Sequence, residues 1–181
     1  VCVIDMPKNS YIDKKIAKKN AMLIFKKTKC DAVKIESNGK NFDIIKCLVE
    51  IGIPVMGHIG FTPQYYKTFK AQGLVEKERI KLIDQAIKIE KAGAFSLVLE
   101  CVKKSVAKDI TKILKIPTIG IGASNYCDGQ ILVTDDMLGL SGFYPRFVKK
   151  FARLDNIIEK SIQKYKKAVL NKNFPNNKNN Y

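Results

Sequence analysis

AVKIESNGKNFDIIKCLVEIGIPVMGH, residues 32–58, places an amphipathic run between two short apolar runs. The flanking runs, Ala32–Glu36 and Ile53–His58, are rich in Val and Ile and almost continuously apolar, which is typical of strands buried on both faces of a parallel sheet. Between them, Asp43–Glu50 carries apolar residues at helical spacing and is followed by Gly52, where a helix C-cap is expected. The stretch therefore predicts a strand–helix–strand unit with the right-handed crossover usual for parallel strands.

The same alternation continues in both directions along the chain. Further short apolar runs lie at Val1–Asp5, Ser96–Glu100, Thr118–Gly122 and Ile131–Val133. Amphipathic runs that predict helices lie at residues 11–27, 79–91, 105–114 and 156–170, and Gly93 marks the end of the second. Strands that alternate with helices in this way indicate an α/β protein with a parallel sheet.

Two α/β architectures fit this pattern: an open doubly wound sheet and a (β/α)8 TIM barrel. No G-x-G-x-x-G motif opens a helix after the first strand, and the G-x-G at Gly120–Gly122 lies at a strand end without the third glycine. This weakens the dinucleotide-binding form of the open sheet. Residues 1–170 are enough for one domain with a substantial core, and the Asn- and Lys-rich residues 171–181 predict a disordered polar tail.

The composition argues against several classes of protein. The formal charge is +16, but only Arg79, Arg146 and Arg153 among the 33 basic residues are arginines. Nucleic-acid sites favour Arg for bidentate contacts, so we attribute the charge to AT-rich codon usage and expect no nucleic-acid partner. No apolar run reaches the ~18 residues of a membrane span. The five cysteines show no C-x-x-C spacing, which indicates reduced thiols in a cytoplasmic protein.

Ionisable side chains stand at the ends of four of the apolar runs: Asp5, Lys34, Glu36, His58 and Glu100. In a parallel barrel the carboxyl ends of the strands meet at one face, and that face holds the active site. Each residue alone is as well explained by a helix cap or by a structural ion pair. Together they predict that five ionisable groups meet in one small volume.

The residue types suggest a division of roles within such a site. Asp5 and Glu36 offer the oxygen ligands that suit Mg²⁺, which commonly takes one or two carboxylates and completes its shell with water and substrate. Partial burial of Glu100 after its apolar strand would raise its pKa, as a general base needs. Lys34 alternates with Glu36 on one strand face and could hold a carboxylate or an enolate oxygen, and His58 could donate a hydrogen bond to substrate.

Several segments resemble ketopantoate hydroxymethyltransferase, and they occur in that family's order. They are Val33–Glu36 (V-K-I-E), Gly57–Gln64 (G-H-I-G-F-T-P-Q), Leu97–Val102 (L-V-L-E-C-V), Pro117–Ala123 (P-T-I-G-I-G-A), Asp128–Val133 (D-G-Q-I-L-V) and Pro145–Val148 (P-R-F-V). Any one of these segments is modestly specific, whereas several in order are very specific. The resemblance extends from the first residue to about Tyr165.

The resemblance implies a (β/α)8 barrel that transfers a hydroxymethyl group from 5,10-methylenetetrahydrofolate to 3-methyl-2-oxobutanoate, giving 2-dehydropantoate for pantothenate synthesis. It also implies a Mg²⁺ cofactor and a homo-oligomer that takes small-molecule substrates. Glu100 matches the family's catalytic base, and Lys34 and His58 match substrate-binding residues. Asp5, in Ile4-Asp5-Met6-Pro7, matches a carboxylate that contacts both metal and substrate, and Glu36 matches a further metal-site carboxylate.

The chain also departs from the family pattern. The family begins with two further strands, one ending in a G-D-S segment whose Asp binds metal, so we expect an incomplete barrel of about six strands that begins inside a fold. Ser37-Asn38 and Ser124 stand where glycines are usual, and Lys103 replaces a proline. Three other readings remain: a different metal-dependent barrel acting on 2-oxo acids, an inactive truncated remnant, and a basic binding module.

Overall fold

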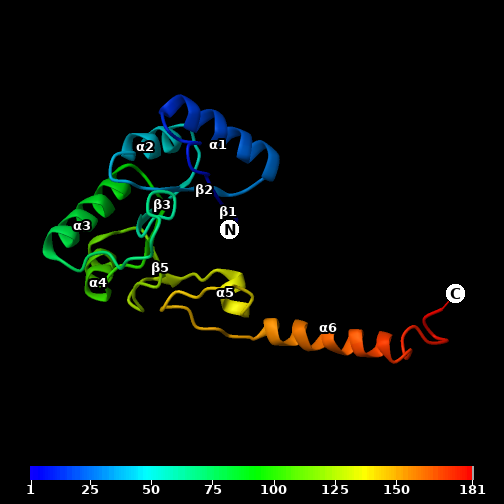
Figure 1. The fold of residues 1–181 in the computed structure, drawn as a ribbon. Coiled ribbons are helices and arrows are strands. Elements are labelled where there is room, and N and C mark those ends of the chain that lie inside the picture. Colours follow the sequence, from blue (N-terminus) through cyan, green and yellow to red (C-terminus); the bar gives the residue numbers. More distant parts are fainter. Residues whose placement is uncertain (181) are drawn as a thin grey trace. The chain divides into compact units, whose positions relative to one another are not determined.

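The computed structural model describes residues 1–180, and the chain divides into two compact units, Val1–Ile131 and Leu132–Tyr181. The strands of the first unit are β1 (Val3–Asp5), β2 (Ala32–Glu36), β3 (Val55–Gly60), β4 (Ser96–Glu100), β5 (Thr118–Ile121) and β6 (Gly129–Gln130). Its helices are α1 (Lys14–Thr28), α2 (Phe42–Glu50), α3 (Glu76–Lys91) and α4 (Lys104–Ile113), and they alternate with the strands (Figure 1).

The six strands form one parallel sheet in the order β1-β2-β3-β4-β5-β6. A doubly wound sheet reverses its strand order at a switch point, whereas this sheet keeps chain order throughout, as the wall of a (β/α)8 barrel does. Within residues 1–180, β1 and β6 do not pair with each other, so the wall remains open. The structure therefore confirms the α/β class and the incomplete barrel of six strands.

Most of the predicted elements lie where the sequence placed them. The strands Ala32–Glu36 and Ser96–Glu100 match their predictions, and β3 begins and ends two residues later than predicted. The prediction of a strand at Ile131–Val133 was wrong, because the ladder with β5 ends at Gln130. Ile131 and Val133 are 55% and 53% exposed, so their apolar character reflects no buried strand.

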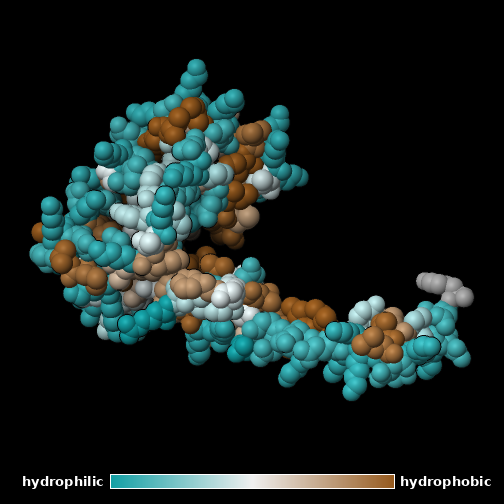
Figure 2. Space-filling view, in the orientation of Figure 1, coloured by the Kyte–Doolittle hydropathy of each residue, from teal (hydrophilic) through white to brown (hydrophobic). Residues whose placement is uncertain are grey.

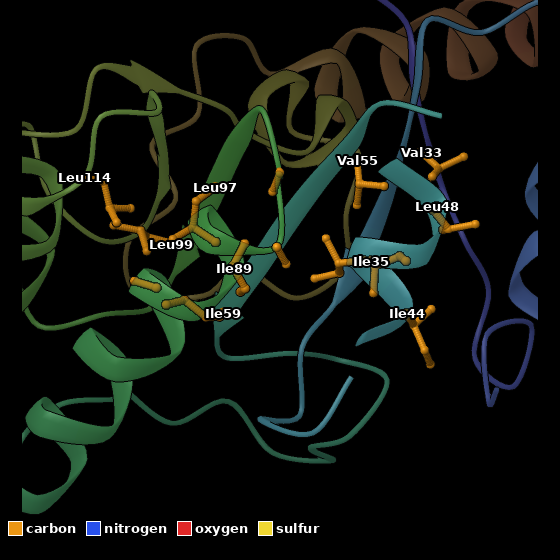
Figure 3. Close-up of a cluster of buried hydrophobic side chains, with 14 of the residues drawn as sticks. Val33, Ile35, Ile44, Leu48, Val55, Ile59, Ile89, Leu97, Leu99 and Leu114 are labelled. Atoms are coloured by element: carbon orange, nitrogen blue, oxygen red, sulfur yellow. The ribbon is translucent and has the colours of Figure 1, made fainter. Parts of the chain in front are cut away.

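The hydrophobic core of the first unit lies between the sheet and its helices. Alternate residues of the central strands supply one side: Val33, Ile35, Val55, Ile59, Leu97 and Leu99, all fully buried (Figure 3). Ile44 and Leu48 of α2 and Ile89 of α3 supply the other side (Figure 3). Because strand side chains alternate between faces, the residues between these apolar ones point to the opposite face of the sheet.

The second unit contains α5 (Thr134–Leu138), a short helix that the sequence pattern did not predict, and α6 (Leu154–Leu170). Helix α6 has no buried residue, and brown, hydrophobic atoms are visible on its surface in Figure 2. Its exposed large hydrophobic side chains are Ile157, Ile158, Ile162, Tyr165, Val169 and Leu170. The prediction of a single domain over residues 1–170 with a disordered tail stays a prediction. Among residues 1–180, no helix combines the length and apolar character that a bilayer span requires.

Candidate active site

The five ionisable residues singled out in the sequence project from one face of the sheet, opposite the helix-covered face. Asp5 is in register with Lys34, Glu36 with His58, and Gly60 with Glu100. Residues in register on parallel strands point to the same face, and side chains two residues apart on one strand do so as well. The sheet therefore places all five groups at the carboxyl ends of β1 to β4, where barrel active sites lie.

A continuous polar contact runs across three of these strands. The Nζ atom of Lys34 lies 2.9 Å from Oδ1 of Asp5 and 3.3 Å from Nδ1 of His58. The Asp5 side chain is 62% exposed. An ion pair that is half in solvent contributes only about 0–1 kcal/mol of stability, so the main effect of this contact is to hold the Lys34 ammonium group in place.

His58 extends this contact to the fourth strand. Its side chain is 1% exposed, and its Nε2 atom lies 3.3 Å from Oε2 of Glu100 at an angle that does not make a hydrogen bond. A buried donor without a hydrogen bond costs about 1–3 kcal/mol. Within residues 1–180, Nε2 is thus a buried hydrogen-bonding atom beside Glu100 that has no partner.

Glu36 lies next to this chain of contacts but has different partners. Its Oε2 atom accepts a 2.9 Å hydrogen bond from the Gln64 backbone N–H, and its own carbonyl oxygen accepts one from Nδ2 of Asn41. Burial raises the pKa of Glu36, and this effect outweighs the opposing influence of the Gln64 N–H, His58 and Lys34. The charged form of Glu36 is therefore disfavoured by burial. Carboxylates with a pKa perturbed in this way cluster at functional sites.

Two residues that the sequence analysis did not assign a role join the site. The Nε2 atom of Gln64 donates to the Met6 carbonyl oxygen at 2.9 Å, and its Oε1 atom accepts from the Tyr11 hydroxyl group at 2.5 Å. Gln64 ends the G-H-I-G-F-T-P-Q segment in the loop after β3, so the motif itself could have pointed to it. Nothing in the local sequence distinguishes Tyr11.

The structure fits a Mg²⁺ ion only in part. Asp5 Oδ2 and Glu36 Oε1 have no hydrogen bond or ion pair with any residue in 1–180, so each carboxylate keeps one oxygen free for a cation. Mg²⁺ often takes no more than two protein carboxylates. Within the same residues, no cluster of three or more His, Cys, Asp or Glu side chains suits a metal ion. Asp5 and Glu36 each offer one free oxygen, so they are the residues that would hold Mg²⁺, with water and substrate completing its shell.

A sequential parallel barrel wall with three carboxylates, a lysine and a histidine at its strand ends defines an α/β protein of the (β/α)8-barrel class with an ionisable strand-end site. The chain belongs to the ketopantoate hydroxymethyltransferase family, whose model matches residues 1–177. This membership confirms the resemblance identified from the sequence motifs.

Curated relatives support the same family. The chain is 49% identical over 179 residues to the 3-methyl-2-oxobutanoate hydroxymethyltransferase of Pelagibacter ubique, covering 99% of this chain and 70% of the relative. It is also 49% identical over 183 residues to 3-methyl-2-oxobutanoate hydroxymethyltransferase 2 of Zymomonas mobilis, covering 99% of this chain and 67% of the relative. The chain thus spans about two thirds of the length of these proteins.

Among solved structures, a putative phosphonomutase from Burkholderia cenocepacia is similar in fold. The match has a TM-score of 0.50 at 12% sequence identity, and it covers 65% of this chain and 52% of the other. At this identity the likeness concerns the fold alone, and it agrees with the barrel wall seen here.

Proposed function

We propose that this chain carries the strand-end site of a 3-methyl-2-oxobutanoate hydroxymethyltransferase. In this reaction the one-carbon unit of 5,10-methylenetetrahydrofolate is joined to C3 of the 2-oxo acid. The observation that carries the proposal is the contact Asp5–Lys34–His58–Glu100 across four adjacent strands. It combines a cation, a buried hydrogen-bond donor and a carboxylate in one place, as the deprotonation of carbon next to a carbonyl group requires.

Glu100 is the base in this proposal. Its carboxylate removes the C3 proton, and the electron pair of the C–H bond moves toward C2 so that the 2-oxo oxygen gains enolate charge. C3 then bonds to the one-carbon unit as one of the two C–N bonds to the folate breaks. Water displaces the second folate nitrogen and leaves its hydroxyl group on that carbon. The C3 proton and the remaining proton of water end on the two folate nitrogens, so the products are 2-dehydropantoate and tetrahydrofolate. No oxidant or reductant is consumed.

Lys34 and His58 bind and orient the 2-oxo acid in the proposal. The Lys34 ammonium group pairs with the carboxylate of the substrate, for which the partly exposed Asp5 leaves room. The unpartnered Nε2 of His58 donates to a substrate oxygen beside Glu100. Both donors are fixed before substrate arrives, so they stabilise developing charge without reorganising.

Asp5 and Glu36 are the residues that would hold Mg²⁺, with Asp5 close enough to Lys34 to contact substrate as well. When bound, the ion would polarise the 2-oxo group and make the C3 proton more acidic. By family membership, the co-substrate is 5,10-methylenetetrahydrofolate. A homo-oligomeric, cytoplasmic protein that takes small-molecule substrates and no nucleic acid remains our prediction.

Exchange of the C3 proton tests the function directly. We would incubate 3-methyl-2-oxobutanoate with protein and Mg²⁺ in heavy water and follow the C3 proton signal by NMR. The proteins are the chain itself and a chimera in which it replaces the matching part of the Pelagibacter ubique relative. Mg²⁺-dependent loss of the signal with the chimera would support the proposal, and a folded chimera without exchange would refute it. The same measurement on the chain alone then shows whether this chain suffices for C3 proton exchange.

A further inference from the structure

Gln64 connects the segments that follow the first three strands. Its side-chain Nε2 donates to the carbonyl oxygen of Met6, the residue directly after Asp5, at 2.9 Å. Its backbone N–H donates to the Glu36 carboxylate, also at 2.9 Å. One residue on the loop after β3 therefore contacts the backbone that carries one of the two carboxylates and the side chain of the other.

Tyr11 fixes how Gln64 is held. The Tyr11 side chain is buried, at 4% exposed, and its hydroxyl group donates to Oε1 of Gln64 at 2.5 Å. Because Oε1 is engaged in this way, the amide can only present Nε2 to Met6, and the orientation of Gln64 is determined by the network.

The local backbone supports the same arrangement. The Thr62 carbonyl oxygen accepts hydrogen bonds from the N–H groups of Tyr65 and Tyr66, which closes a tight turn around Pro63 and Gln64. Pro63 fixes its own φ angle and lacks an N–H group. The turn thus directs the Gln64 N–H toward Glu36.

We propose that Gln64, held by Tyr11, is a positioning residue that sets the separation and orientation of the Asp5 and Glu36 carboxylates for a divalent cation. This rests on the proposed function, in which these two carboxylates hold Mg²⁺. Partners that orient metal ligands commonly change metal affinity about 10–100-fold when they are removed. A merely structural clamp would change stability and leave the affinity of the folded protein for Mg²⁺ the same.

Two substitutions separate these roles. Tyr11→Phe keeps the ring and removes only the hydroxyl group that holds Gln64. Gln64→Met keeps the side-chain length and the backbone N–H but removes both side-chain hydrogen bonds. The matched controls are Tyr66→Phe and Gln72→Met in the same loop. Tyr66 is 45% exposed, and the Gln72 side-chain amide donates a hydrogen bond to the Lys70 carbonyl oxygen, away from both carboxylates' hydrogen bonds.

The first readout is the Mg²⁺ dissociation constant of the chain, measured by isothermal titration calorimetry, with the melting temperature in the absence of Mg²⁺ as the measure of fold. We expect Tyr11→Phe and Gln64→Met to weaken Mg²⁺ binding about 10–100-fold while both controls bind as the unchanged chain does. Unchanged affinity in folded Tyr11→Phe would overturn the inference, and so would a lack of Mg²⁺ binding by the unchanged chain.

The second readout distinguishes the inference from the proposed function. In the chimera, C3 proton exchange by Tyr11→Phe should recover toward that of the unchanged protein as Mg²⁺ is raised, because only the apparent affinity for the ion has changed. A rate that stays low at saturating Mg²⁺ would contradict positioning of the carboxylates for the cation. If the unchanged chimera shows no exchange but Tyr11→Phe still weakens Mg²⁺ binding, the proposed hydroxymethyltransferase function is refuted. The positioning role of Gln64 is then still supported.

Discussion

The side-chain nitrogen of Lys34 lies 3.3 Å from Nδ1 of His58. A lysine ammonium group can only donate hydrogen bonds, so Nδ1 must accept, and the neutral imidazole must carry its proton on Nε2. The Nε2 atom that carries this proton lies 3.3 Å from Oε2 of Glu100. Lys34 therefore determines the tautomer of His58 and, through it, the hydrogen-bonding character of the site.

The tautomer can be observed directly, because His58 is the only histidine in the chain. We predict that ¹H–¹⁵N correlation spectra show the Nε2–H form of His58 in the unchanged protein. In Lys34→Met, which removes the cation but retains most of the stem, Nδ1 loses its donor, and the spectra should show a mixture of tautomers. Lys46→Met on the exposed surface of α2 is the control. A single Nε2–H form in Lys34→Met would contradict this role of Lys34.

Glu100→Gln tests the base. A positioned general base contributes about 10²–10⁴-fold to a proton transfer, so we expect C3 proton exchange by the chimera to fall by that factor. The amide has almost the same shape as the carboxylate, and Glu100 does not hold the ion in our proposal. Mg²⁺ affinity should therefore fall far less than the rate of exchange does. Exchange at the normal rate would remove Glu100 from its assigned role.

Glu36→Gln should raise stability and weaken Mg²⁺ binding at the same time. Glu36 is 7% exposed, and burial of its carboxylate disfavours the charged form. The amide carries no charge, and its oxygen can still accept from the Gln64 N–H. We expect urea denaturation at pH 7 without Mg²⁺ to show a higher free energy of unfolding than in the unchanged chain. Glu50→Gln, an exposed change on α2, should alter it by less than about 0.5 kcal/mol. A less stable Glu36→Gln would refute this prediction.

Gly60, the last residue of β3, is in register with Glu100 of β4. Its φ angle is +96°, and a Cβ atom there would overlap the Glu100 carbonyl oxygen, which accepts a 2.8 Å hydrogen bond from Phe61. We expect Gly60→Ala to lower the free energy of unfolding by about 2–5 kcal/mol, from the unfavourable φ angle and the clash together. Gly52 has a φ angle of +84° but open space around it, so Gly52→Ala should cost only about 1–2 kcal/mol. Equal losses in urea denaturation would show that the contact with Glu100 is unimportant.

Cys101 provides a test at alkaline pH. Burial, with a smaller contribution from the Glu100 charge, raises the pKa of its thiol to about 11. The folded chain therefore holds this proton more tightly than the unfolded chain. The resulting stabilisation is complete below the unfolded pKa of about 9 and is lost as the pH rises through 11. The stability advantage of the unchanged chain over Cys101→Ala should decline over this range.

Alkylation provides a second measurement of Cys101. At pH 8 iodoacetamide should modify the exposed Cys2 at least about tenfold faster than the buried Cys101, because the thiolate is the nucleophile. The difference between the alkylation rates of Cys2 and Cys101 should become smaller toward pH 11. Mass spectrometry of digests measures both rates. Rapid modification of Cys101 at pH 8 in the folded chain would contradict the raised pKa.

The parts of the fold that depend on local pattern were predictable. The strand Ala32–Glu36 is largely buried, and this leaves an apolar signature in a few consecutive residues. Ile131–Val133 shows the limit of the same reasoning: its apolar character matches a strand, but the ladder with β5 ends one residue earlier. Strand identity is a local property, whereas strand ends depend on the neighbouring strand.

The sequence by itself determined the parallel α/β class, the family and the set of ionisable residues at the strand ends, because hydrophobic periodicity and strand polarity are written in short segments. Only the tertiary structure decided which of those residues touch. Lys34 and His58 are 24 positions apart, and Gln64 lies 58 positions from Met6 and 53 from Tyr11. Contacts over such separations follow from sheet register and loop geometry, which bring together side chains whose identities carry no local sign of their partners.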